Sequence, residues 1–112
     1  NPTAAAAVAL HALKALDESE RTSVCDFLTQ MQTSEGGFIA NQRMPLEDLL
    51  STFTALVTLW ELEAIEQANL QRAQRYAQQM ARTTGGFAGF ALDPAQDVEY
   101  TFYGLGTLAL LA

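Results

Sequence analysis

Apolar side chains recur along this chain with helical spacing, in two distinct patterns. Around 20–33 and 67–82 they follow one another at intervals of three and four, which gives one apolar stripe and a polar remainder. The stretches 3–16, 47–62 and 97–112 are apolar around nearly the whole helix circumference. A helix of this second kind must be covered on both sides. The pattern therefore predicts alternating two-sided and one-sided helices.

The pattern repeats with a shift of 49 residues, which lays 24–62 over 73–111 without a gap. The identical pairs are Gln30/Gln79, Met31/Met80, Gly36/Gly85, Gly37/Gly86, Phe38/Phe87, Pro45/Pro94, Asp48/Asp97, Thr52/Thr101, Phe53/Phe102, Leu56/Leu105, Thr58/Thr107, Leu59/Leu108 and Leu62/Leu111. Self-similarity at a fixed period of this length is typical of repeat architectures. We therefore expect two units, about 20–62 and 67–111, with one more inner helix before them.

These features predict an all-α fold, an α/α toroid of about five helices in which an outer ring covers an inner ring. The segments between the predicted helices support this fold. Gly-Gly-Phe stands at 36–38 and at 85–87, where the outer helices must end. Asp48 and Asp97 then open the inner helices, as N-cap residues do. We expect long loops between each Gly-Gly-Phe and the next Asp, and exposed apolar edges on the outermost inner helices.

Length and composition narrow the class of protein. The 112 residues suit one domain, 1–112, and we expect a piece of a longer protein, because the chain lacks an initiator Met and ends in an apolar run. Six basic residues against thirteen acidic ones give a net charge of −7, which disfavours nucleic-acid partners and anionic membrane surfaces. No apolar run is long enough to span a membrane. We expect a cytoplasmic protein.

Cysteine and histidine are too scarce for most metal sites. The chain has one Cys and one His, which excludes a disulfide framework and a thiolate-rich zinc site. We expect Cys25 to be a small buried residue of an outer helix. His11 has no acidic partner on its own helix, and we expect it to serve in packing.

The two Gly-Gly-Phe segments, each followed by a helix that opens Asp-x-x-x-Thr-Phe, resemble the repeats of the prenyltransferase and squalene-cyclase family. The likeness is closest to the β subunits of protein prenyltransferases of the geranylgeranyl type. There, Asp-x-Cys-Tyr-Ser-Trp-Trp follows one Gly-Gly-Phe, and Asp-x-x-His-Thr follows the next. This chain has Asp-Leu-Leu-Ser-Thr-Phe at 48–53 and Asp-Val-Glu-Tyr-Thr-Phe at 97–102. The resemblance implies the last third of a toroid whose central cavity takes an isoprenoid.

The resemblance also locates the zinc ligands of that family. Asp48 stands at the Asp position, but Leu50 replaces the Cys and Tyr100 replaces the His. Leucine cannot ligate a metal and tyrosine is a rare zinc ligand, so we expect no complete metal site and no cofactor. The basic residues that clamp a lipid diphosphate precede the first motif, where this chain offers Arg43. The standard zinc chemistry is therefore not expected from this segment.

The remaining candidates are aromatic. Phe53, Tyr100, Phe102 and Tyr103 are candidates to line a cavity for an apolar substrate, and Arg43 completes the set of candidate substrate-binding residues. The alternative is that these aromatic side chains are plain core. No catalytic residue can be assigned from the sequence.

Three functions stay open. The first is a prenyltransferase-like enzyme that handles an isoprenoid, with catalytic parts outside this segment. The second is a non-catalytic toroid module that binds an apolar ligand, a protein partner or the rest of the barrel. The third is a terpene-cyclase-like enzyme in which the carboxyl pair Asp97 and Glu99 protonates an alkene, although the acid cluster Asp-x-Asp-Asp is missing. Loss of the zinc ligands favours the second function for this segment.

Overall fold

The computed structural model describes residues 11, 15–90 and 98–112, and the predicted helix at 3–16 falls almost wholly outside them. Their elements are α2 (Glu18–Gln30), β1 (Phe38–Asn41), β2 (Met44–Asp48), α3 (Leu49–Glu61), the short 3-10 helix η1 (Ile65–Gln67), α4 (Leu70–Gln79) and α5 (Val98–Leu111). The four described α-helices coincide with four of the predicted ones: α3, α4 and α5 are shorter by a few residues, and α2 begins two residues earlier and ends three residues earlier than predicted.

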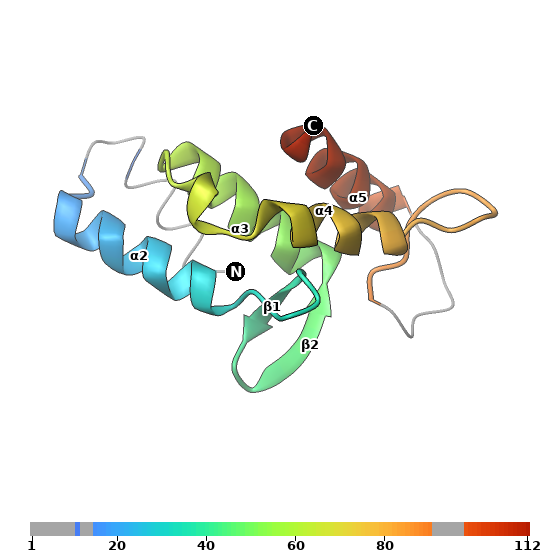
Figure 1. Cartoon of the computed structure of the whole chain (residues 1–112), viewed down its shortest axis with the longest axis horizontal. Coiled ribbons are helices and arrows are strands. Elements are labelled where there is room, and N and C mark those ends of the chain that lie inside the picture. Colours follow the sequence, from blue (N-terminus) through green and yellow to red (C-terminus); the bar gives the residue numbers. More distant parts are fainter. Residues whose placement is uncertain (1–10, 12–14, 91–97) are drawn as a thin grey trace.

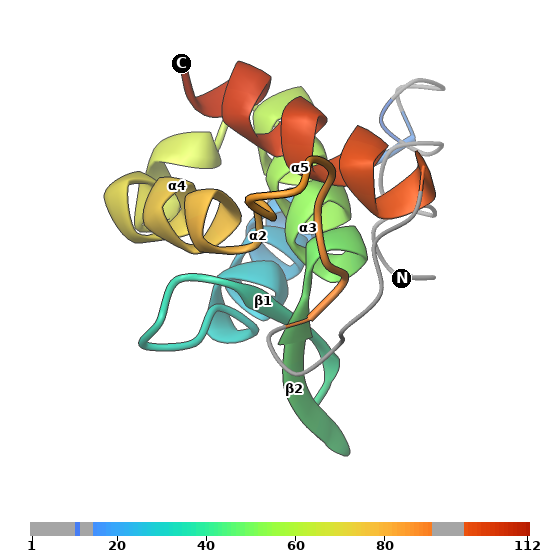
Figure 2. The same ribbon diagram turned by 90° about the vertical axis from the view of Figure 1, so that its right-hand side faces the viewer.

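Inner and outer helices alternate as the apolar pattern predicts. α2 packs against α3, α4 packs against α5, and the two inner helices α3 and α5 pack against each other. Figure 1 shows α2 and α4 on the near side of α3, with α5 beside them, and Figure 2 shows α3 in the middle of the group. None of the described helices is both long and apolar enough to cross a membrane.

The helices α2 and α3 each begin with an aspartate N-cap. At α2, the Oδ1 of Asp17 accepts the N–H of Glu20 at 2.8 Å, and the Glu20 carboxylate accepts the N–H of Asp17 at 3.4 Å, which completes a capping box. At α3, the Oδ1 of Asp48 accepts the N–H of Ser51 at 2.7 Å. The predicted capping role of Asp48 is confirmed, and Asp97 lies outside the described residues.

The expected long loop after the first Gly-Gly-Phe is instead an antiparallel β-hairpin. β1 pairs with β2 in a register that sets Phe38 opposite Asp48 and Asn41 opposite Met44. The side chain of Asn41 makes the turn, since its Oδ1 accepts the N–H groups of Arg43 and Met44 at 2.9 and 3.0 Å. All-α is thus only approximate: the fold is mostly helical with one small two-stranded sheet.

The backbone closes each Gly-Gly-Phe turn in the same way. The equivalent bonds join Thr33 N–H to Gly37 O (2.8 Å) and Arg82 N–H to Gly86 O (2.9 Å), then Ile39 N–H to Met31 O (2.9 Å) and Ala88 N–H to Met80 O (2.9 Å). The threonine of each inner helix completes the closure: Thr52 Oγ1 accepts the N–H of Phe38 at 2.9 Å, and Thr101 Oγ1 accepts that of Phe87 at 3.2 Å. The sequence repeat is therefore a structural repeat.

A side-chain bridge joins the two repeats. Gln32, at the end of the first outer helix, donates from Nε2 to the carbonyl oxygen of Asn69 at 2.9 Å and accepts the N–H of Asn69 at 2.8 Å. Asn69 is the N-cap of α4, and its own Oδ1 accepts the N–H of Arg72. This bridge holds the start of the second outer helix against the first turn.

The core lies between the inner and outer helices, and Cys25 is buried in it as expected. Burial raises the pKa of the Cys25 thiol. The second face of the inner helices differs from expectation, because Leu50, Trp60, Phe102 and Leu105 are exposed. Coverage on both sides was predicted, but no described element packs over that face. The apolar edge predicted for the last inner helix is present on α5 as Phe102 and Leu105, and the edge predicted for 3–16 falls outside the described residues.

Candidate functional site

Four of the five candidate substrate-binding residues come together at the contact between α3 and α5. The Phe53 ring meets Phe102 edge-to-face, with centroids 5.7 Å apart and planes at 71°, and its centroid lies 5.7 Å from that of Tyr103. Phe102 and Tyr103 are 5.6 Å apart, and Tyr100 and Tyr103 are 6.5 Å apart. These separations are those of interacting aromatic pairs. We call this group the aromatic wall.

The aromatic wall is not plain core, because its outermost ring faces solvent. Phe102 is 62% exposed, whereas Phe53 and Tyr103 are half-buried. Gly106 brings the two helices together, since a Cβ at that position would lie 2.5 Å from Cε1 of Phe53. Sequence reasoning did not single out Gly106, although a glycine inside an apolar helix is a signal of close approach.

One carboxylate belongs to this region. The Oη of Tyr103 donates to Oε1 of Glu99 at 3.1 Å, one helical turn earlier. This hydrogen bond is the main reason why the pKa of Tyr103 is raised, since it favours the protonated phenol beside a negative charge. Glu99 is thus engaged with Tyr103, while Asp97, its partner in the predicted carboxyl pair, lies outside the described residues.

The three positions that correspond to the zinc ligands of the resembled enzymes also come together. Asp48, Leu50 and Tyr100 line one pocket of about 340 Å³, although Tyr100 comes from the second repeat. The other lining residues are Ala40, Met44, Leu46 and Phe90. We call this the hairpin pocket, because β1 and β2 supply one side of it. The sequence signal for that side was the alternation of Met44, Leu46 and Asp48 along one strand face.

The side chains of the hairpin pocket do not fit a zinc ion. Asp48 is the one described side chain of the three that could ligate a metal, and its Oδ1 and Oδ2 also accept the N–H of Ser51 at 2.7 Å and its hydroxyl at 2.9 Å. Leu50 carries no donor atom, and a tyrosine is a rare zinc ligand. In the described part of the chain, no three His, Cys, Asp or Glu side chains gather in a way that suits a metal ion.

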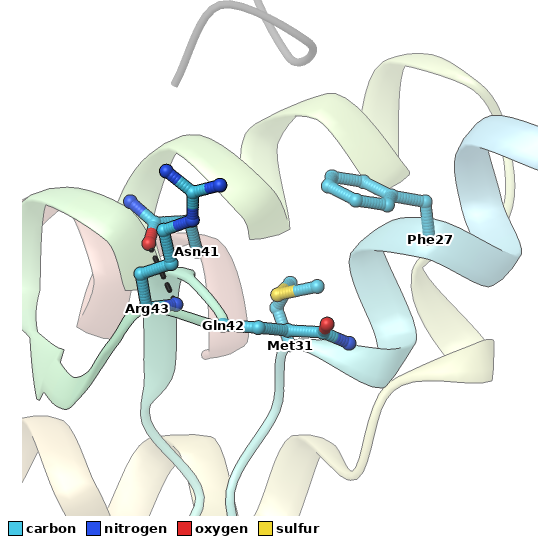
Figure 3. A pocket seen from close by; sticks show the side chains of 5 residues that line it. All are labelled: Phe27, Met31, Asn41, Gln42 and Arg43. Atoms are coloured by element: carbon cyan, nitrogen blue, oxygen red, sulfur yellow. Dashed lines mark hydrogen bonds between the residues drawn. The ribbon is translucent and has the colours of Figure 1, made fainter.

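Arg43, the fifth candidate, does not line the pocket to which Tyr100 of the aromatic wall belongs. It follows the turn of the hairpin and lines another pocket, of about 460 Å³, with Phe27, Met31, Asn41 and Gln42. Figure 3 shows Arg43 and Asn41 on one side of this pocket, with Phe27 and Met31 of α2 across from them. This pocket and the hairpin pocket share no lining residue. The structure therefore does not place a diphosphate clamp beside the aromatic wall.

His11 lines a third pocket, at the far end of the inner helices. Trp60, Glu61 and Glu63 complete its lining, around a volume of about 400 Å³. The acids that share this pocket with His11 come from a distant part of the sequence. Glu61 is the last residue of α3 and Glu63 follows it. His11 matches Trp60 after the shift of 49 residues, and the two side chains line the same pocket.

The comparison with known proteins agrees with this architecture. Residues 1–112 match the family model described as the prenyltransferase alpha-alpha toroid domain. No individual curated protein matches the chain. The match spans the whole chain and fits the paired inner and outer helices, the repeated Gly-Gly-Phe turns and the Thr hydrogen bonds that close them. The chain therefore belongs to the prenyltransferase alpha-alpha toroid family.

Proposed function

We propose that this chain binds an isoprenoid, or an apolar chain of similar shape, against the aromatic wall, and that its own residues supply no zinc chemistry. The observation that carries the proposal is the wall itself: four aromatic side chains from two repeats meet at the contact of α3 and α5, and Phe102 remains 62% exposed. Large exposed aromatic groups in one place are typical of binding surfaces on soluble domains.

The resemblance to protein geranylgeranyltransferase β subunits supports the class of ligand. The Gly-Gly-Phe turns and the Asp-x-x-x-Thr motifs are shared with those enzymes, and the resemblance assigns the inner helices to their lipid cavity. The replaced zinc ligands, and the place of Arg43 in a different pocket from Tyr100, favour a non-catalytic binding role over transferase activity by this segment. The cyclase alternative gains no support, because Glu99 is hydrogen-bonded to Tyr103.

A fluorescence titration tests this proposal. Trp60 is the only tryptophan of the chain and lies on α3, so its emission reports energy transfer to a bound anthraniloyl-tagged farnesol. We expect saturable quenching in the wild-type chain. Phe102→Ala should weaken binding by about tenfold, since that loss corresponds to about 1.4 kcal/mol of aromatic contact.

Phe27→Ala is the matched control, because it removes another exposed aromatic side chain from the outer helix α2. Its binding curve should follow that of the wild-type chain. Absence of saturable binding, or equal losses in Phe27→Ala and Phe102→Ala, would contradict the proposal.

A further inference from the structure

The hairpin pocket has an apolar side made by a strand that also has a polar side. Along β2, Met44, Leu46 and Asp48 alternate onto one face and line the pocket. Glu47, on the other face, accepts a hydrogen bond from Thr33 and approaches Gly37. β2 therefore turns Met44 and Leu46 to the pocket, while Glu47 lies on the opposite face beside its partner Ile39.

The apolar face of the hairpin is open. Met44 is 60% exposed and Leu46 is 46% exposed, on a two-stranded sheet that has a free edge. Large apolar side chains on an exposed strand are a liability for solubility, and soluble proteins usually place charged residues there. In this chain they converge instead with Leu50, Phe90 and Tyr100. That convergence indicates a surface that is covered when a ligand binds.

We infer that the hairpin pocket, at the position where the resembled enzymes hold zinc, receives a hydrocarbon end of the ligand that lies along the aromatic wall. This inference rests on the proposed function. Tyr100 connects the two sites, because it lines the pocket and stands 6.5 Å from Tyr103 of the wall. A volume of about 340 Å³ is at the low end for ligand pockets, so it accommodates part of a long ligand.

Asp48 is the only carboxylate among the described residues that line the pocket, and it is compatible with an apolar occupant. A buried charge without hydrogen bonds is costly, but both oxygens of Asp48 accept hydrogen bonds from Ser51. Asp48 also caps α3, where a negative charge is stabilised by the helix dipole. Asp48 is therefore accounted for by the fold, and neither a metal nor a basic ligand is needed to neutralise it.

Cobalt titration distinguishes an apolar pocket from a metal site. We expect the wild-type chain to show no tetrahedral Co²⁺ absorption, and Leu50→Cys/Tyr100→His to gain such bands with thiolate-to-metal charge transfer, because Asp48, Cys and His would then meet. Stoichiometric Co²⁺ binding by the wild-type chain, lost in Asp48→Asn, would overturn the inference. Asparagine keeps the N-cap, so that variant leaves the helix start intact.

The same titration tests whether the three positions converge. If Leu50→Cys/Tyr100→His does not fold, as judged by circular dichroism, the swapped pair Leu50→His/Tyr100→Cys takes its place. A folded variant of either kind that stays silent with Co²⁺ would overturn the shared pocket on which the inference depends.

Binding of the tagged farnesol tests the apolar occupant directly. Leu46→Gln should weaken binding roughly fivefold, because a polar amide replaces an apolar contact at the pocket. Pro45→Ala is the control: it lies on the same strand, outside the pocket lining, and should leave affinity unchanged. If Phe102→Ala weakens binding while Leu46→Gln does not, the inference fails and the proposed function stands. If the wild-type chain binds no farnesol, both fail.

Discussion

The two copies of the repeat close their Gly-Gly-Phe turns with the same backbone hydrogen bonds, but only the first turn is covered by another helix. Gly36 lies buried beneath the second outer helix, where an added Cβ would lie 2.1 Å from the carbonyl oxygen of Arg72. Gly85, the equivalent residue, is exposed, and an added Cβ there would have no neighbour within 4 Å. The backbone is nearly the same, with φ of 105° and 99°.

The same contrast extends to the inner helices. Leu56 of α3 is fully buried, whereas its equivalent Leu105 of α5 is 57% exposed. Phe53 is half-buried and Phe102 is exposed. Each copy therefore encodes its own turn, while the burial of its side chains depends on the next copy along the chain. This is the behaviour expected of a solenoid, in which stability is the sum of unit and interface terms.

Substitution of the equivalent glycines Gly36 and Gly85 should show the largest difference in stability between the two copies. Gly36→Ala introduces both backbone strain at positive φ and a collision with the backbone of Arg72, and should destabilise the chain by about 3 kcal/mol or more. Gly85→Ala introduces only the strain and should cost about 1–2 kcal/mol. Urea unfolding followed by circular dichroism measures both. Equal losses would show that α4 does not cover the first turn.

Removal of the threonine hydrogen bond should show a smaller difference in stability between the two copies. Thr52→Val leaves the buried N–H of Phe38 without its acceptor and should cost about 2 kcal/mol. Thr101→Val removes a longer, partly buried bond of 3.2 Å and should cost about 1 kcal/mol. The ratio of the two losses in the same unfolding assay measures how tightly each turn is closed. A larger loss for Thr101→Val would reverse the comparison.

Tyr76 offers a stabilising change. Its ring is buried, its hydroxyl has no hydrogen-bond partner among the described residues, and its equivalent in the first copy is Phe27. Tyr76→Phe should therefore stabilise the chain by about 1 kcal/mol at neutral pH. Loss of stability in Tyr76→Phe would mean that the hydroxyl does find a partner.

The pH dependence of Tyr76 has a definite sign. Burial, with the charges of Glu47 and Asp48, raises the pKa of the phenol. A raised pKa in the folded state gives stability that is complete below the unfolded pKa, about 10, and is lost as the pH rises above it. Tyr76→Phe should flatten the fall in stability between neutral and strongly alkaline pH. An unchanged profile would contradict the assignment.

The smallest expected effect on stability is at the aromatic wall. Phe102→Ala removes a side chain that is mostly in solvent and should change the free energy of unfolding by less than about 0.5 kcal/mol. Its loss of farnesol binding then reflects ligand contact and not unfolding. A large destabilisation would mean that Phe102 belongs to the core and that its exposure misrepresents its role.

Helix order and the repeat were predictable because they depend on local signals. The spacing of apolar residues locates α2 to α5, and Gly-Gly-Phe locates the turns, since Gly36 and Gly85 both require positive φ. The capping role of Asp48 follows from its residue type and place. The meeting of Phe53 with Phe102 was predictable only as a consequence of stacked repeats.

The hairpin and the pocket positions were not predictable in the same way. β1 and β2 are short, and their turn depends on the Asn41 side chain instead of a glycine pair. Arg43 lies in the turn of the hairpin and lines a different pocket from Tyr100, and periodicity along the sequence does not fix that placement. Likewise, Glu61 and Glu63 line one pocket with His11 although they lie about 50 residues apart in the sequence.

Photo-crosslinking tests most directly the claim that an apolar ligand lies on the inner helices of both copies. A benzophenone-tagged farnesol is bound, irradiated and mapped by peptide mass spectrometry. The account predicts labels within Leu49–Glu61 and Val98–Leu111, which carry Phe53 and Phe102. Labels confined to the outer helices Glu18–Gln30 and Leu70–Gln79 would contradict it.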